Sequence, residues 1–216
     1  APLTEIGFGS FATVQKHIPG YPMGGFWARA VDKDSNGTPV LTNGSVTLGE
    51  EYYVGPSLPT REIGLTNTFT VFDNFRVFSN LDYKGGHYQW CAICSVRSRT
   101  NLNTRELTDP NTSPERVAEL RSLQTATWIK PSDFIKLREL SLTYQLPASV
   151  LQSISVSNAS FTVSGRNLWM WTKYEFDEPG LGSPDPEVNF DSNSAFGRTD
   201  YASIPMLRTF SASIRF

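Results

Sequence analysis

Short runs in which apolar and polar side chains alternate every two residues constrain the fold of this chain most. Residues 65–71 alternate Leu, Asn, Phe and Val with three threonines, and residues 75–84 resume the alternation after Asp73-Asn74. Successive side chains of a β-strand point to opposite faces of the sheet, so each run is typical of a strand. The spacing predicts a β-hairpin whose two-residue turn is Asp73-Asn74.

Three further runs with the same alternation lie in the second half of the chain, at 134–146, 158–169 and 204–216. Pro147 ends the first of them, because proline cannot donate to a strand ladder. The connection 147–154 is short and can hold one helical turn. We therefore expect these three runs and the hairpin to form antiparallel strands that pair as neighbours in chain order.

Long polar stretches separate the strand runs, and they exceed the usual length of loops in compact domains. They are 32–62, 85–133 and 170–203. Within the second, 113–123 predicts one short surface helix, because Ser113 can cap it and Pro114 fits its first turn. Short connections that alternate with long loops are typical of a transmembrane β-barrel. The periodicity alone fits a soluble β-sandwich with long loops equally well.

Composition excludes several classes of protein. The chain has 216 residues, of which 39% are hydrophobic and 19% charged, with a net charge of −2. These values argue against a disordered tail and a basic nucleic-acid-binding arm. No apolar run approaches the ~18 residues of a transmembrane helix. Nucleophile-elbow, zinc-protease, P-loop and dinucleotide motifs are absent, so we expect no enzyme, no catalytic residue and no cofactor.

The two cysteines, Cys91 and Cys94, form a C-x-x-C motif. Such a pair can be a redox centre or half of a zinc site. A second pair is missing, and the two histidines, His17 and His87, lie at no ligand spacing from it. A local disulfide or two inert thiols is therefore the favoured interpretation, and we expect no metal site.

Three segments after residue 132 carry the most specific pattern in the chain: DFIKLRELSLTYQLP at 133–147, SFTVSGRNLWMWTKY at 160–174, and Asp185-Pro186-Glu187-Val188-Asn189 followed by the terminal strand. In this order they resemble the C-terminal part of SusC/RagA-type TonB-dependent outer-membrane transporters. The residues that match the family pattern most clearly are Arg138, Tyr144, Pro147, Gly165, Arg166, Asn167, Asp185, Pro186 and Glu187.

The resemblance implies an all-β fold, in which antiparallel up-and-down strands form part of a large transmembrane β-barrel of about 22 strands. Residues 1–216 would be its C-terminal part, without the plug domain and the N-terminal strands. The family takes up bulky nutrients, glycans or peptides, across the bacterial outer membrane. It works with a SusD-like surface lipoprotein and is energised by the TonB complex, which it contacts through the missing N-terminal region.

The resemblance also assigns sides to the strands. With Phe216 at the periplasmic rim, the loops 85–133 and 170–203 are extracellular. Phe210, Ile214 and Phe216 are then similar to the family's barrel-assembly signal. The side chains expected to face lipid are Leu140, Leu142, Tyr144, Phe210, Ile214 and Phe216.

Several polar and aromatic residues have more than one interpretation. Trp169, Trp171 and Tyr174 form either an interfacial aromatic girdle or a surface that contacts a sugar or a partner. Arg166 and Asn167 are expected at the lumen or the rim. The carboxylates of the loop after Tyr174 favour a solvated loop over a Ca²⁺ site or an acid–base pair; they are Asp177, Glu178, Asp185, Glu187 and Asp191. The rival to a transporter is a soluble carbohydrate-binding β-sandwich that uses Trp169 and Trp171.

Overall fold

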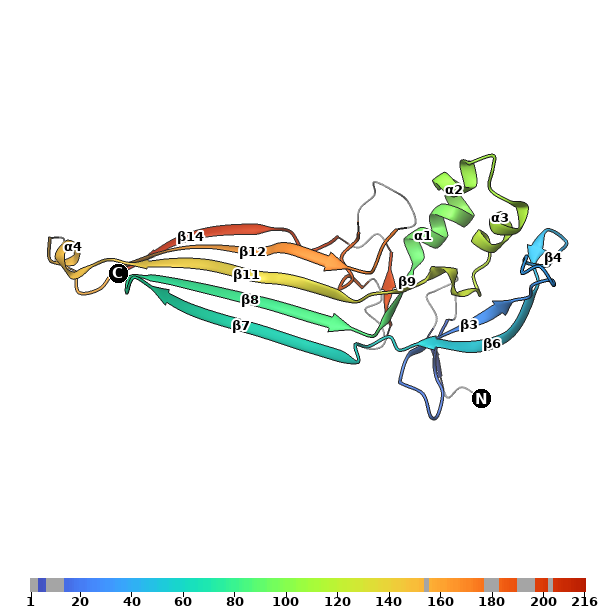
Figure 1. The fold of residues 1–216 in the computed structure, drawn as a ribbon, viewed down its shortest axis with the longest axis horizontal. Coiled ribbons are helices and arrows are strands. Elements are labelled where there is room, and N and C mark those ends of the chain that lie inside the picture. Colours follow the sequence, from blue (N-terminus) through green and yellow to red (C-terminus); the bar gives the residue numbers. More distant parts are fainter. Residues whose placement is uncertain (1–3, 7–13, 154–155, 177–182, 190–196, 202–203) are drawn as a thin grey trace. The chain divides into compact units, whose positions relative to one another are not determined.

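A long antiparallel sheet and a separate, mixed region make up the computed structural model of this chain, which describes residues 4–6, 14–153, 156–176, 183–189, 197–201 and 204–216 (Figure 1). The two regions are compact units. We call Arg61–Lys84, Phe134–Trp171 and Met206–Phe216 the sheet unit. We call Ala1–Thr60, Gly85–Asp133 and Thr172–Pro205 the mixed unit.

Five strands form the sheet unit, in the order β14-β12-β11-β8-β7. Their bounds are β7 Arg61–Val71, β8 Phe75–Gly85, β11 Phe134–Gln145, β12 Ser160–Thr172 and β14 Thr209–Arg215. Strands β8 and β11 pair antiparallel, as do β12 and β14. The predicted order of neighbours is confirmed. The last strand begins later than predicted, at Thr209 instead of residue 204.

The turn of the β7–β8 hairpin lies one residue earlier than predicted. Phe72 and Asp73 have left-handed φ values of +49° and +59°, as the two central residues of a type I′ turn do. Asn74 instead extends the pairing toward β11: its carbonyl accepts from the Gln145 N–H at 2.7 Å, and its amide donates to the Gln145 carbonyl at 3.0 Å. The prediction of an Asp73-Asn74 turn was therefore wrong by one residue.

A single helical segment, α4 (Ala148–Ser153), connects β11 to β12, as predicted. The Pro147 carbonyl accepts from the N–H groups of Val150 and Leu151 at 3.0 and 3.2 Å. Pro147 thus both ends the strand and begins the helical turn.

The mixed unit contains three small sheets, of order β1-β2-β3-β6, β10-β9-β13 and β4-β5. Strand β13 runs parallel to β9, and the other pairs that the structure describes here are antiparallel. The bounds are β1 Thr4–Ile6, β2 Gln15–His17, β3 Gly25–Val31, β4 Leu41–Thr42, β5 Ser45–Val46, β6 Leu48–Gly55, β9 Tyr88–Cys91, β10 Ile129–Pro131 and β13 Thr199–Asp200.

Short helices fill the loop after β9. They are α1 Ala92–Val96, the π-helical η1 Arg97–Asn101, α2 Arg105–Thr108, α3 Pro114–Leu120 and the 3-10 turn η2 Ala126–Trp128. The predicted helix is α3: the Ser113 hydroxyl accepts from the Arg116 N–H at 3.2 Å, and Pro114 lies in the first turn. No helix among the described residues is long and apolar enough to cross a membrane.

Large aromatic side chains form the core of the mixed unit. Phe26, Trp90, Trp128 and Tyr174 are fully buried there. Cys91 and Cys94 belong to the same core and are joined by a disulfide. Of the two interpretations that the sequence favoured, a local disulfide or two inert thiols, the structure thus confirms the disulfide. In the part of the chain that the structure describes, no group of three or more His, Cys, Asp or Glu side chains could hold a metal ion.

Candidate functional site

The two faces of the five-stranded sheet differ in chemistry. Residues directly opposite each other in an antiparallel pair share a face. Leu142 lies opposite Val77, and Phe161 lies opposite Ile214. The hydroxyls of Thr143 and Thr162 are 2.9 Å apart on the other face, so their chain neighbours Leu142 and Phe161 share the first face. We call this the apolar face; it includes Phe75, Val77, Leu140, Leu142, Tyr144, Phe161, Val163, Phe210, Ala212 and Ile214.

Side chains on the apolar face are exposed. Phe210 and Ile214 are 76% and 63% exposed, and Leu140, Leu142 and Phe216 are also exposed. Tyr144 is half-buried, since its ring packs against Phe75 with the centroids 4.8 Å apart. A sheet in water usually buries such a face against a core. Its exposure is the pattern expected of strands that face lipid.

The opposite face, which we call the polar face, carries cross-strand ion pairs and hydrogen bonds. Arg138 binds Asp82 at 2.6 Å, Arg166 binds Glu139 at 3.2 Å, and the hydroxyls of Ser164 and Ser211 meet at 2.8 Å. Lys84 and Glu62 form a longer ion pair at 3.8 Å. These contacts join all five strands, so the polar face is organised by directional interactions.

An extra residue in β11 explains why two consecutive charged side chains serve the same face. The register between β11 and β8 shifts by one residue between Leu137 and Glu139. Such a β-bulge lets two neighbouring residues oppose one on the partner strand. Arg138 and Glu139 can therefore both lie on the polar face, where Arg138 pairs with β8 and Glu139 with β12.

The Gly165-Arg166-Asn167 motif produces a similar shift in β12. Asn167 has a left-handed φ of +52°, and its amide donates to the Leu207 carbonyl at 3.1 Å. A Cβ on Gly165 would lie 2.7 Å from Cδ2 of Leu168 and 3.2 Å from Cδ1 of Phe210. Leu168 therefore covers Gly165 on the apolar face, although three residues separate them.

The shift at Asn167 decides where the aromatic residues that follow lie. With Leu168 on the apolar face, strict alternation places Met170 there too and Trp169 and Trp171 on the polar face. Both tryptophans are well exposed, at 50% and 44%. Sequence alternation alone would have continued the series Phe161, Val163 and Gly165 through Trp169, on the apolar face.

Tyr174 does not belong to this aromatic surface. It is fully buried in the mixed unit, and its hydroxyl donates to Oδ2 of Asp200 at 3.1 Å. Burial, with the nearby Asp200 carboxylate, raises the pKa of Tyr174 well above its ordinary value. Burial also raises the pKa of Asp200, partly offset by the hydrogen bond from Tyr174. Tyr174 is thus a core residue and not the surface ring that the sequence suggested.

The acidic motif after β12 forms a turn. Oδ1 of Asp185 accepts from the Glu187 N–H at 2.9 Å, and its carbonyl accepts from the Val188 N–H at 3.2 Å. The Gln89 amide of β9 donates to the Val188 carbonyl at 2.6 Å. Asp185 and Pro186 are buried, so these residues hold the turn against β9. Of the other carboxylates considered from the sequence, Asp177, Glu178 and Asp191 lie outside the described residues.

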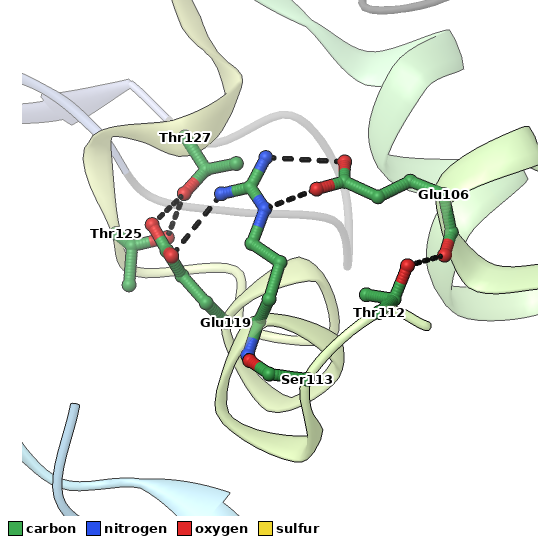
Figure 2. Close-up of polar contacts among 7 residues, drawn as sticks. Glu106, Thr112, Ser113, Glu119, Thr125 and Thr127 are labelled. Atoms are coloured by element: carbon green, nitrogen blue, oxygen red, sulfur yellow. Dashed lines mark hydrogen bonds and ion pairs between the residues drawn. The ribbon is translucent and has the colours of Figure 1, made fainter. Parts of the chain in front are cut away.

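A guanidinium network in the mixed unit was not evident from the sequence (Figure 2). Arg116 binds Glu106 through two nitrogens, at 2.6 and 3.2 Å, and Glu119 at 3.1 Å. Glu119 also accepts from the Thr127 hydroxyl at 2.9 Å. The hydrogen bonds to Glu106 raise the pKa of Arg116 further. The network connects α2, α3 and η2, which are too short to be stable alone.

Comparisons with known proteins agree with this geometry. No protein-family model matches the chain. It is 27% identical to TonB-dependent receptor P3 of Formosa agariphila over 187 residues, 80% of this chain and 18% of that protein. It superimposes on the RagAB peptide importer in the open-open state with a TM-score of 0.65 and 19% identity, covering 99% of this chain. The chain resembles SusC/RagA-type TonB-dependent transporters, as its motifs predicted.

The closed-closed state of the same importer gives a TM-score of 0.60 at 18% identity. This chain spans about a quarter of the RagAB chains and less than a fifth of the curated receptor. Its fold, mostly β with antiparallel strands, is similar to the matched part of the RagAB chains.

Most of the SusC/RagA motif residues have a visible structural role. Gly165 leaves room for Leu168, Asn167 sets the bulge, and Arg138 and Arg166 make cross-strand ion pairs. These roles act on the register of the sheet. The assembly-signal role of Phe210, Ile214 and Phe216 stays a prediction.

Proposed function

We propose that residues 1–216 are the C-terminal part of the barrel of an outer-membrane active transporter for bulky nutrients. The plug domain and the N-terminal strands would belong to the rest of a longer chain. The observation that carries the proposal is a sheet whose apolar face is exposed while its other face is polar and hydrogen-bonded. A barrel wall between lipid and an aqueous lumen needs this distribution.

The free edges of the sheet support a role within a larger barrel. Strands β7 and β14 are the two edge strands of the five-stranded sheet that the structure describes. Unpaired edges of this length promote aggregation unless another strand covers them. Closure with further strands of the same barrel would satisfy the backbone groups of both edges.

The proposed cargo is a glycan or a peptide, and the proposed energy source is the TonB complex, reached through the N-terminal region. A SusD-like surface lipoprotein would bind the extracellular loops. The resemblance to TonB-dependent receptors and the likeness to a peptide importer support this assignment. The mixed unit, with its own core and disulfide, would then form the extracellular side of this part of the barrel.

Uptake by intact cells tests the proposal. Cells that carry the full-length transporter should take up a labelled glycan or peptide pool, and the uptake should cease when TonB is deleted. A strain that lacks the transporter is the control. If residues 1–216 are instead secreted as a soluble monomer that binds sugar through Trp169 and Trp171, the carbohydrate-binding β-sandwich is the correct interpretation.

A further inference from the structure

The Cys91–Cys94 disulfide lies inside the core of the mixed unit. Cys91 is 0% exposed and Cys94 is 8% exposed. Both side chains belong to the buried cluster that also contains Trp90, Trp128 and Tyr174. Thiol–disulfide exchange requires a thiolate of one molecule to attack a sulfur of the other, so that the two pass through a mixed disulfide. A second protein therefore needs contact with one of these sulfurs, and the folded unit buries both cysteines.

The surroundings of the pair differ from those of a redox centre. Reactive cysteines lie in partly exposed sites where the thiolate is stabilised, whereas buried structural cysteines are inert. Cys91 lies at the end of β9, the central strand of its small sheet, opposite Asp200 of β13. Its Sγ accepts from the Cys94 N–H at 3.3 Å in the first turn of α1. A C-x-x-C motif alone left a redox centre open, and this burial argues against it.

The residues that bury the pair come from distant parts of the chain. Phe26 precedes Cys91 by 65 residues, Trp128 follows Cys94 by 34 residues, and Tyr174 follows it by 80 residues. A chain is synthesised and begins to fold from its N-terminal part, so both thiols emerge before Trp128 and Tyr174 do. The pair is therefore accessible on the unfolded chain and inaccessible once the core has closed.

We propose that a periplasmic thiol oxidase joins Cys91 to Cys94 on the unfolded chain, before the core of the mixed unit closes. The inference rests on the proposed outer-membrane location, which takes the chain through the periplasm, where disulfides form. One cysteine thiolate attacks the oxidase disulfide and releases an oxidase thiolate; the second attacks the mixed disulfide and releases the other. The two cysteine thiols lose two protons and two electrons, and the oxidase disulfide gains both electrons and becomes a dithiol.

Early oxidation also favours the closure of the core. The disulfide fixes the first turn of α1 to the end of β9, where β10 and β13 flank Trp90. A cross-link removes conformations from the unfolded chain that folding would otherwise have to remove. The helix α1 is too short to be stable alone. The oxidised turn is therefore a preformed element on which the later aromatic residues pack.

Thiol trapping during export tests the order of the two events. The full-length transporter is pulse-labelled in cells, and each sample is treated with a polyethylene-glycol maleimide, which adds mass to free thiols, and with protease. The band shift counted is the one that the double variant Cys91→Ala, Cys94→Ala lacks. We expect this shift to disappear before residues 85–133 become protease-resistant. Chains that become resistant first and are oxidised afterwards overturn the proposal.

Reduction of the finished protein tests how well the core excludes other thiols. The full-length transporter in membranes is incubated with reduced thioredoxin or with dithiothreitol, with and without denaturant. Since exposure of the pair requires local opening, we expect reduction of the folded pair to be at least about a hundredfold slower with either reductant. A small cavity borders Cys94 beside Leu120 and Phe176, so dithiothreitol is the more stringent probe. Comparable rates in folded and unfolded protein overturn the proposal and favour a redox centre.

Two tryptophan changes provide a matched comparison. Trp128 is buried in the same cluster as the pair, whereas Trp169 is exposed in the sheet unit. Trp128→Ala should speed reduction of the folded pair at least about tenfold, because the cavity it leaves opens the core. Trp169→Ala should leave the rate unchanged. Equal rates in the two variants overturn the claim that the core protects the pair, and the unmodified protein remains a test that depends on neither variant.

These measurements follow the cysteines and not the cargo. Outer-membrane yield and energised uptake are recorded in parallel. A chain that shows no energised uptake counts against the transport function and leaves the order of oxidation and folding measurable. Late oxidation of already folded chains overturns the present inference and leaves the transport function intact.

Discussion

The sheet unit and the mixed unit place the same kinds of side chain in opposite environments. In the sheet unit, Leu142, Phe210 and Ile214 are exposed, whereas in the mixed unit Trp90 and Trp128 are buried with a disulfide. Burial of aromatic rings stabilises the mixed unit from within. The sheet unit is held together by hydrogen bonds and cross-strand pairs. Its exposed apolar side chains would stabilise it only if apolar surroundings covered them. One chain thus contains a region with a buried apolar core and a region with an exposed apolar face.

Removing a core ring should have the largest effect and should fall on the mixed unit. Trp128 is buried, and its indole donates to the Ser122 carbonyl at 2.8 Å. Trp128→Ala should destabilise the unit by about 3–5 kcal/mol. Limited proteolysis of the full-length transporter in membranes measures it, with cleavage expected between residues 85 and 133. Unchanged protease resistance would mean that this core does not hold the unit together.

Charge on the apolar face of the sheet should act on membrane assembly. Leu142→Arg or Ile214→Arg should each cost about 2–4 kcal/mol near the bilayer midplane, so the yield of heat-modifiable transporter in the outer membrane should fall. The matched controls are Thr143→Arg and Ser213→Arg, their neighbours on the polar face. Equal yields for both pairs would break the distinction between the two faces.

The Tyr174–Asp200 contact gives the stability of the mixed unit a dependence on pH. Because the folded unit holds the pKa of Tyr174 above its ordinary value of about 10, stability is full below that pH and falls as the pH rises through it. Tyr174→Phe should cost about 1–3 kcal/mol at neutral pH, since it leaves buried Asp200 without its donor.

Thermal unfolding of the mixed unit, followed from pH 7 upward by protease resistance, measures this dependence. The gap between Tyr174→Phe and the unmodified protein should narrow above about pH 10. A gap that stays constant would show that the phenol does not ionise on unfolding in this range.

The smallest effect is expected at the end of the last strand. Phe216→Asp places a charge where an aromatic ring favours the interface, which costs about 0–1 kcal/mol in a barrel. Outer-membrane yield should still fall below that of Ser211→Asp and Ser213→Asp, because of the likeness to an assembly signal. Fractionation at equal expression compares the three, and equal yields would remove the assembly role of Phe216.

Alternation in the sequence was sufficient to predict the strands of the sheet unit and their order. It missed the turn at Phe72-Asp73 and the polar-face position of Trp169 and Trp171, because a single left-handed residue shifts the alternation without changing the composition. An asparagine within a strand, two residues after a glycine, is the signal that could have indicated the shift at Asn167. Sequence periodicity could not predict the burial of Tyr174, because its hydroxyl pairs with Asp200, 26 residues further along the chain.

In the mixed unit, the sequence predicted only those features that depend on residues close together in the chain. Ser113 and Pro114 predict the start of α3, and the spacing of Cys91 and Cys94 allows their disulfide. The Arg116 network joins three elements through side chains three to ten residues apart in the sequence, and no periodic pattern encodes such contacts.

The paired bulges of β11 and β12 let each strand hold one more residue without turning any side chain to the other face. A bulge absorbs an added residue, so the parity of the sequence changes at Arg138 and at Asn167 while the faces of the flanking residues do not. Both extra residues lie on the same side of the Glu139–Arg166 ion pair, so the two strands still match in length. Deleting Arg138 together with Asn167 would therefore restore strict alternation in both strands and leave Trp169 and Trp171 on the polar face.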